Sequence, residues 1–251
     1  MTDYAKLYYS KKNNVKKFEQ NRFYGEFGAY LRTFDILFFV HNKIVASSDI
    51  KSTIDVGAGT GRLTQELCEF YSDSKITAFD FSKEMLTEFA GKCSNLKNKP
   101  DLVIGNAQDI SYEDQKFDMV ISSRLLMHVT DWELTLNELC RISGKYLLFD
   151  FPPTSSIGAV GHGVLAKLLK KDNNFEAYKK INLSKAVQVL RQNNFIVKHI
   201  ERPFVLPLPV HLKLNNLKTS KMIELMFKCF KMDKFFGAPV YIAAERIKGM
   251  S

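Results

Sequence analysis

The sequence lacks any apolar run near the length of about 18 residues that crosses a bilayer. Its N-terminus carries lysines but neither an apolar core nor a small-residue cleavage site, so it does not resemble a secretory signal. Its four cysteines are far apart and form no CxxC pair. These absences predict a cytoplasmic protein whose thiols stay reduced.

Metal-binding patterns are also missing. The five histidines show no HxxxH spacing and no clustering with cysteine, so we predict no metal site. Hydrophobic residues make up 45% of the 251 residues and charged residues 25%, which is typical of a globular chain with a buried core.

From residue 51 the chain alternates short β-branched runs with helical patterns. Helices are predicted at Leu63–Tyr71, Lys83–Cys93, Trp132–Ser143 and Asn182–Gln192, with Ser82 as the N-cap of the second. Seven strands are predicted: Ser52–Val56, Lys75–Phe79, Asp101–Gly105, Phe117–Ser122, Tyr146–Asp150, Phe195–Glu201 and Val240–Arg246. Such alternation predicts an α/β fold whose mostly parallel sheet is covered on both faces.

A glycine-rich loop, DVGAGTGRL, follows the first strand at residues 55–63. It lies at the carboxyl edge of the sheet, where bare backbone and the next helix's free N–H groups can hold a ligand. A P-loop would end in Gly-Lys-Ser/Thr, and the dinucleotide fingerprint is GxGxxG rather than the GxGxG present here. Asp80, at the end of the next strand, is placed to accept the two hydroxyls of a ribose.

At this point four motifs resemble those of the class I S-adenosylmethionine-dependent methyltransferases, in the small-molecule branch. They are DVGAGTGRL, ITAFDFSKEML, GNAQDI and FDMVISSRLLMHV, in the family's order and spacing. The resemblance implies a Rossmann-like, doubly wound, seven-stranded sheet. We expect a single domain: residues 1–50 as a helical cap, 51–150 as the cofactor-binding core, and 151–251 as substrate-lid segments and final strands.

The resemblance also implies roles for individual residues. The loop would pack on the methionine and ribose part of S-adenosylmethionine, Asp80 would accept the ribose hydroxyls, and Phe81 would lie against adenine. Asn106 stands where the family often has an acid. The expected cofactor-binding residues are Asp55, Gly57, Ala58, Gly59, Gly61, Asp80, Phe81, Asn106, Ala107, Gln108, Ser122 and Ser123.

Substrate contacts are less constrained by the motifs. His128 is the candidate general base or substrate contact, with a structural histidine as the alternative. Arg124 is expected either to face solvent or to recognise an acidic substrate. Tyr24 and His162 could line a substrate pocket, although packing roles would account for both.

The net charge of +9 owes much to residues 213–234, where an apolar stripe runs between lysines. We weigh three interpretations of Lys213–Lys234: a surface helix packed on the core, a substrate lid, and a contact with an anionic membrane. We expect methyl transfer to a small organic molecule. RNA or protein methylation and cofactor binding without catalysis remain alternatives, whereas SSRLL after the fourth strand and the absence of Pro-Cys argue against DNA.

Overall fold

One mixed sheet organises the chain. The computed structural model describes residue 15 and residues 23–46, 49–157 and 179–247. The strand order is β3-β2-β1-β4-β5-β7-β6, and β7 is the one strand that runs opposite to the other six. The strands are β1 Ser52–Val56, β2 Lys75–Asp80, β3 Asp101–Ile104, β4 Phe117–Ser122, β5 Ser143–Phe151, β6 Phe195–Glu201 and β7 Val240–Arg246. The predicted seven-stranded, doubly wound fold is therefore confirmed.

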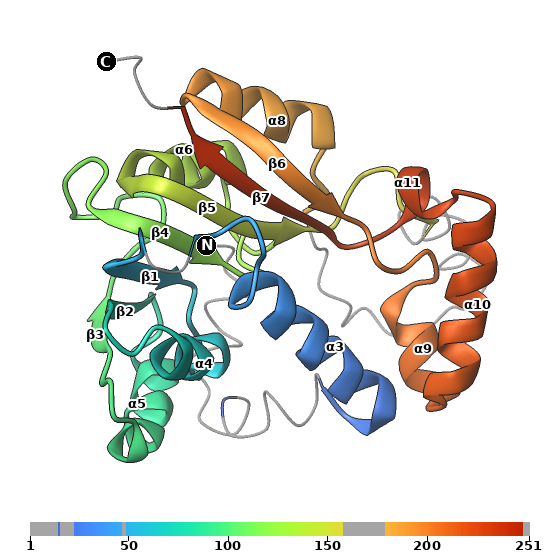
Figure 1. Cartoon of the computed structure of the whole chain (residues 1–251), viewed down its shortest axis with the longest axis horizontal. Helices are drawn as coiled ribbons and strands as arrows, with labels where there is room; N and C mark the ends of the chain where they lie inside the picture. The colour runs from blue at the N-terminus through green and yellow to red at the C-terminus, as the bar shows by residue number, and fades with distance from the viewer. Residues whose placement is uncertain (1–14, 16–22, 47–48, 158–178, 248–251) are drawn as a thin grey trace.

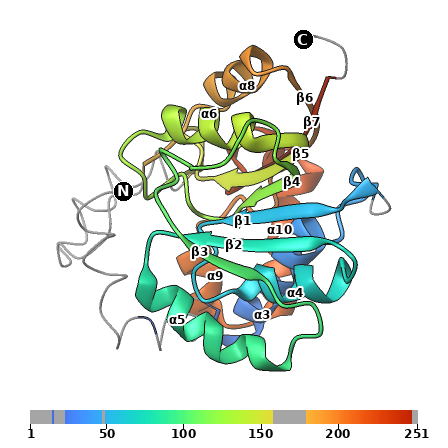
Figure 2. The same cartoon turned by 90° about the vertical axis from the view of Figure 1, so that its left-hand side faces the viewer.

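Helices cover both faces of this sheet. Figure 1 shows α6 and α8 above it and α3, α4 and α5 below it, and Figure 2 shows the same layers from the side. Their bounds are α3 Gly25–Phe39, α4 Arg62–Phe70, α5 Lys83–Lys92, α6 Trp132–Ile142 and α8 Leu183–Gln192. A short 3-10 turn, Cys93–Asn95, follows α5. The predicted Ser82 N-cap is confirmed, since its hydroxyl accepts the N–H of Met85 at 3.1 Å.

The two largest hydrophobic clusters among the described residues lie on opposite faces of the sheet. Successive residues of β4 point to opposite sides, so Val120 packs with α6 and α8 while Met119 and Ile121 pack with α3 and α4. All three residues are fully buried. Near-continuous apolar strands such as β4 are expected in a parallel sheet whose two faces are both covered.

The long insertion between β6 and β7 lies beyond the carboxyl ends of the parallel strands. This follows from the register, because the first residue of β7, Val240, pairs with Phe151, the last residue of β5. The insertion forms α9 Leu208–Leu214, α10 Leu217–Cys229 and α11 Asp233–Phe236, on the right in Figure 1. Within the residues that the structure describes, no helix has the length and apolarity needed to cross a membrane.

The orientation of α10 corrects one expectation. Its apolar stripe does not pack on the core: Met222, Leu225, Met226 and Phe230 are 58% to 76% exposed. The buried positions of α10 are instead Ser220 and Glu224. The interpretation of residues 213–234 as an ordinary amphipathic helix packed through its stripe is therefore wrong.

Candidate active site

The glycine loop turns sharply at the end of β1 and is held against β2. The N–H groups of Gly57 and Ala58 both donate to the carbonyl of Phe79, at 2.8 and 3.2 Å. Gly57, Gly59 and Gly61 all have positive φ, between +57° and +83°. Because L side chains rarely adopt this conformation, the spacing of the three glycines follows from the backbone path itself.

Two of these glycines differ in what surrounds them. A Cβ built on Gly61 would meet the ring of Phe89 at 2.1 Å, so Gly61 is required by packing inside the protein. A Cβ on Gly59 would meet no heavy atom of the described residues within 4 Å. The backbone at Gly59 therefore borders open space, as a surface that receives a ligand requires.

Asp80 connects the end of β2 to this loop. Its Oδ2 accepts the N–H of Gly59 at 2.8 Å, and its Oδ1 accepts the N–H of Ser82 at 2.9 Å. Burial raises the pKa of Asp80 to about 6, against the opposing effect of these backbone hydrogen bonds. Each carboxylate oxygen keeps a lone pair, so the ionised group can still accept hydroxyls placed over the loop.

Asp55 lies deeper than Asp80. Its Oδ2 accepts the hydroxyl of Thr64 at 2.7 Å, which fixes β1 to the first turns of α4. Burial raises its pKa to about 6, and the Thr64 hydrogen bond opposes that rise. The structure thus shows Asp55 in a buried structural contact, and its expected role toward the amino-acid end of the cofactor stays a prediction.

The turn after β3 carries the expected adenine contacts. The Asn106 side chain accepts the N–H of Gln108 at 3.1 Å, so it shapes the turn. The side-chain oxygen of Gln108 accepts the hydroxyl of Thr130 at 2.8 Å, which links this turn to the loop before α6. Ala107 packs on the core and Phe81 is half-buried. Their contacts with adenine stay predictions.

Two serines lie at the carboxyl end of β4, beside β1: Ser122 is its last residue and Ser123 follows it. The Ser122 hydroxyl donates to the carbonyl of Val56 at 3.0 Å, which ties the two strands together. The Ser123 hydroxyl is buried and has no hydrogen-bond partner within the described part of the chain. A buried polar atom without a partner is costly, and the expected contact of Ser123 with the cofactor stays a prediction.

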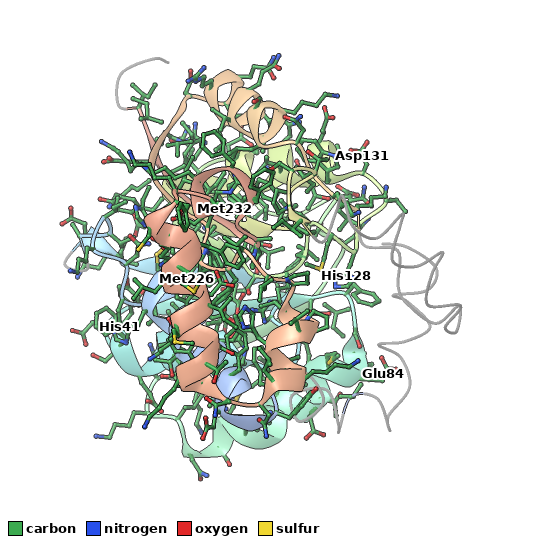
Figure 3. All side chains as sticks on the ribbon, turned by 90° about the vertical axis from the view of Figure 1, so that its right-hand side faces the viewer. His41, Glu84, His128, Asp131, Met226 and Met232 are labelled. Atoms are coloured by element: carbon green, nitrogen blue, oxygen red, sulfur yellow. The ribbon has the colours of Figure 1, made fainter. Side chains whose placement is uncertain are left out.

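His128 lies in the turn that follows β4 and its side chain is 4% exposed. Figure 3 shows it on the same side of the molecule as Asp131, the N-cap of α6, and Glu84, in the first turn of α5. Lys179 donates its backbone N–H to the carbonyl of Met127, so the chain returns to this turn after residue 178. The role of His128 as a base stays a prediction.

Arg124 belongs to a buried ionic group that the sequence did not suggest. Asp35, fully buried on α3, receives Arg124 Nη2 at 2.9 Å, Arg62 Nη2 at 3.1 Å and the hydroxyl of Tyr241 at 2.7 Å. The expectation that Arg124 faces solvent is wrong, since its side chain is 9% exposed. The aromatic ring of Phe23 covers both guanidinium groups.

Protonation in this group favours a charged Arg124. Burial lowers its pKa, but Asp35 and the neighbouring Tyr241 and Asp150 outweigh burial and raise it. For Arg62 burial prevails and the pKa is lowered. Asp35 could have been noticed as the one acid among Phe34, Leu37 and Phe38 in an apolar helix.

Two expected substrate residues remain, Tyr24 and His162. Tyr24 is the N-cap residue of α3 and is 48% exposed, so its place in a pocket stays a prediction. His162 lies outside the described residues.

Together the four strand ends form a cradle of suitable chemistry for S-adenosylmethionine. It combines open backbone at Gly59, the carboxylate of Asp80 and the hydroxyl of Ser123, which has no partner among the described residues. These match a flat nucleoside with two ribose hydroxyls and a polar amino-acid end. The residues therefore fit the cofactor that the motifs imply.

Sequence comparison with known proteins also indicates a methyltransferase. Residues 54–147 match the family model described as a methyltransferase domain. A demethylmenaquinone methyltransferase of Oceanobacillus iheyensis is 33% identical over 113 residues, covering 43% of this chain and 48% of the relative. A malonyl-[acyl-carrier protein] O-methyltransferase of Priestia megaterium is 33% identical over 86 residues, covering 34% and 30%. The chain thus spans half or less of the length of these relatives.

A solved structure extends the likeness over the whole fold. Magnesium protoporphyrin IX methyltransferase from Synechocystis, crystallised with S-adenosylhomocysteine, superposes with a TM-score of 0.67 at 14% identity, covering 97% of this chain and 98% of that one. At this identity the likeness concerns the fold. Residues 54–147 therefore form a methyltransferase domain, set in the seven-stranded fold of the class I S-adenosylmethionine-dependent methyltransferases.

Proposed function

We propose that this chain transfers a methyl group from S-adenosylmethionine to a small organic molecule. The observation that carries the proposal is the 2.8 Å hydrogen bond between the N–H of Gly59 and the carboxylate of Asp80. It brings the open turn of the glycine loop and a buried acid to one point at the carboxyl edge of the sheet. A nucleoside bound there would contact both the backbone of the glycine loop and the Asp80 carboxylate that accepts the ribose hydroxyls.

In this proposal the chain works by placing the reactants. The bound cofactor supplies a methyl group already activated on a positively charged sulfur. Alignment of an acceptor can then contribute several kcal/mol, up to about 7–11 kcal/mol in the best oriented cases. Asp80 would hold the ribose, and Ser123 would bind the amino-acid end. His128 would remove a proton only from an acceptor that is protonated at the working pH.

The relatives' names support a small acceptor. They refer to demethylmenaquinone, malonyl-[acyl-carrier protein] and magnesium protoporphyrin IX, which suggests an organic acceptor that is lipophilic or acidic. Oxygen, nitrogen and carbon acceptors are all compatible with this geometry. RNA or protein methylation is the alternative, supported by net charge alone.

We also propose a reducing compartment, the cytoplasm, as its place of action. Cys68, Cys93, Cys140 and Cys229 are all free thiols in the structure. Burial raises the pKa of both Cys68 and Cys140 to about 12, so these two thiols are unreactive near neutral pH.

Calorimetry with S-adenosylhomocysteine tests the cofactor site. The native chain should bind, Asp80→Ala should bind at least about tenfold more weakly, and the exposed control Asp101→Ala should bind as the native chain does. Equal binding by the native chain and Asp80→Ala would remove Asp80 from the site. No binding by the native chain would refute the proposed function.

Transfer itself needs a second assay. Label from methyl-labelled S-adenosylmethionine is followed into quinols, carboxylic acids, phenols and amines, with bulk RNA and protein as further acceptors. Label in a small molecule supports the proposal. Label confined to RNA or protein would favour the alternative, and label in none of them would favour a cofactor-binding protein without catalysis.

A further inference from the structure

Helix α10 presents its apolar side to solvent. Met222, Leu225, Met226 and Phe230 recur at helical spacing and are 58% to 76% exposed. We call these four residues the outer stripe. Just beyond α10, Phe235 is also more than half exposed. In Figure 3 α10 lies at the front of the molecule, with Met226 labelled on it.

The opposite side of α10 is fixed by a buried acid. Glu224 accepts the backbone N–H groups of Val205 and Leu206 at 2.8 and 3.0 Å, and its Oε1 lies 2.7 Å from Nε2 of His211. The ring of His211 is in turn stacked on Phe27 of α3. Turning the outer stripe inward would strip Glu224 of all three partners, so the outward position of the stripe is a built feature.

The stripe has positive charge around it. Residues 213–234 contain two acids, Glu224 and Asp233, and the first is turned inward. Lys221 and Lys228 line a cavity of about 130 Å³ between α3 and α10, beside the stripe. The lysines of this segment are Lys213, Lys218, Lys221, Lys228, Lys231 and Lys234, all exposed.

We propose that the outer stripe and its lysines dock the protein on an anionic membrane surface. A helix with exposed Met, Leu and Phe on one side and lysines along its flank is the form that lies in the interface of a bilayer. Each lysine near an anionic surface contributes about fivefold in affinity. An acidic protein surface would satisfy the lysines but would leave the continuous apolar stripe unexplained.

Docking there also orients the candidate active site. The insertion that carries α10 connects the carboxyl end of β6 to β7, so it lies on the same edge of the sheet as Asp80 and the glycine loop. A lipophilic acceptor would then approach from the bilayer without crossing bulk water. This last step rests on the proposed function, whereas membrane docking does not.

Vesicle sedimentation of the full chain tests the docking. Vesicles of neutral phosphatidylcholine are compared with vesicles containing about one third phosphatidylglycerol. We expect binding to the anionic vesicles, at least tenfold weaker binding to the neutral ones, and loss of affinity as salt is raised. Equal affinity for both vesicle types, or binding to neither, would overturn the proposal.

Paired variants separate the stripe from the lysines. Leu225→Ser with Met226→Ser removes apolar area, and its control is Leu134→Ser, an exposed leucine on α6. Lys228→Glu with Lys231→Glu reverses charge, and its control is Lys97→Glu with Lys99→Glu, which makes the same change in net charge. These control lysines belong to the segment between α5 and β3, and in Figure 1 α5 and β3 lie on the opposite side of the molecule from α10.

We expect both α10 variants to lose at least tenfold in affinity for the anionic vesicles, and both controls to lose less than threefold. Urea unfolding and S-adenosylhomocysteine binding show whether each variant remains folded with its cofactor site intact. Equal losses in variants and controls would overturn the proposal. So would a dimer in solution that the stripe variant dissociates, because the stripe would then be an interface between two copies.

Discussion

The buried carboxyl of Asp80 should make the protein less stable as pH rises, and Asp80→Asn should remove that effect. Burial raises the pKa of Asp80 from 3.8 to about 6. The folded chain therefore holds this proton more tightly than the unfolded chain does. Protonation favours the folded state, and ionisation costs stability progressively as pH rises from about 4 to about 6.

The size of the effect follows from the two pKa values. A full difference of about 2.2 units corresponds to about 3 kcal/mol, since one unit is worth 1.36 kcal/mol. Part of this stability has already been lost at about pH 5, because Asp80 is then ionised in the unfolded chain. Between about pH 5 and pH 8 the free energy of unfolding should fall by about 1.4 kcal/mol on account of Asp80 alone.

Urea unfolding at several pH values, followed by the fluorescence of Trp132, measures this. The difference in unfolding free energy between Asp80→Asn and the native chain should shift by about 1.4 kcal/mol in favour of the variant over that interval. Asp55 has a similarly raised pKa, but it is present in both proteins and largely cancels. The exposed Asp73→Asn serves as control. Parallel pH profiles for native chain and Asp80→Asn would refute the reasoning.

Three further outcomes are expected. Gly61→Ala should destabilise the fold by about 2 kcal/mol or more, because its methyl group meets the Phe89 ring and φ is +78°, and urea unfolding measures this. Asp35→Asn should cost about 3–5 kcal/mol by leaving two buried guanidinium groups without their carboxylate; a cost under about 1 kcal/mol would contradict the ionic group as described. Affinity for S-adenosylhomocysteine should fall about tenfold per pH unit below about 6 as Asp80 takes up its proton, with calorimetry as the measure.

Much of the fold was predictable because its signals are local. Four strands, including β1 and β4, have the predicted bounds, since apolar β-branched runs end at glycines or polar residues that cannot continue them. Asp80 was predictable for the same reason, as a polar residue ending an apolar strand. The predicted β5 was too short by three residues at its start, because its pairing with β4 extends it back to Ser143.

Residues that act through distant partners were not predictable. Arg124 reads as an exposed or substrate-binding cation until Asp35, 89 positions earlier, is seen beside it. Ser122 and Ser123 are adjacent and alike in sequence, yet one hydroxyl bonds Val56 and the other has no partner in the described chain. Such differences depend on which strand is the neighbour, and sequence periodicity carries no information about neighbours.

The orientation of α10 shows most clearly what hydrophobic periodicity cannot predict, namely whether an apolar side of a helix is buried. A stripe at helical spacing reveals that one side is apolar, and the usual inference that this side is buried assumes that burial outweighs every competing interaction. Leaving four large apolar side chains about 60% exposed forgoes roughly 4–7 kcal/mol of burial. That is a large share of the 5–15 kcal/mol that typically stabilises a folded chain. The three partners of Glu224 hold the helix in this position, and a surface that covers the outer stripe would recover the missing burial. The burial free energy that the outer stripe forgoes in the isolated chain is therefore the free energy that favours docking of α10 on a membrane.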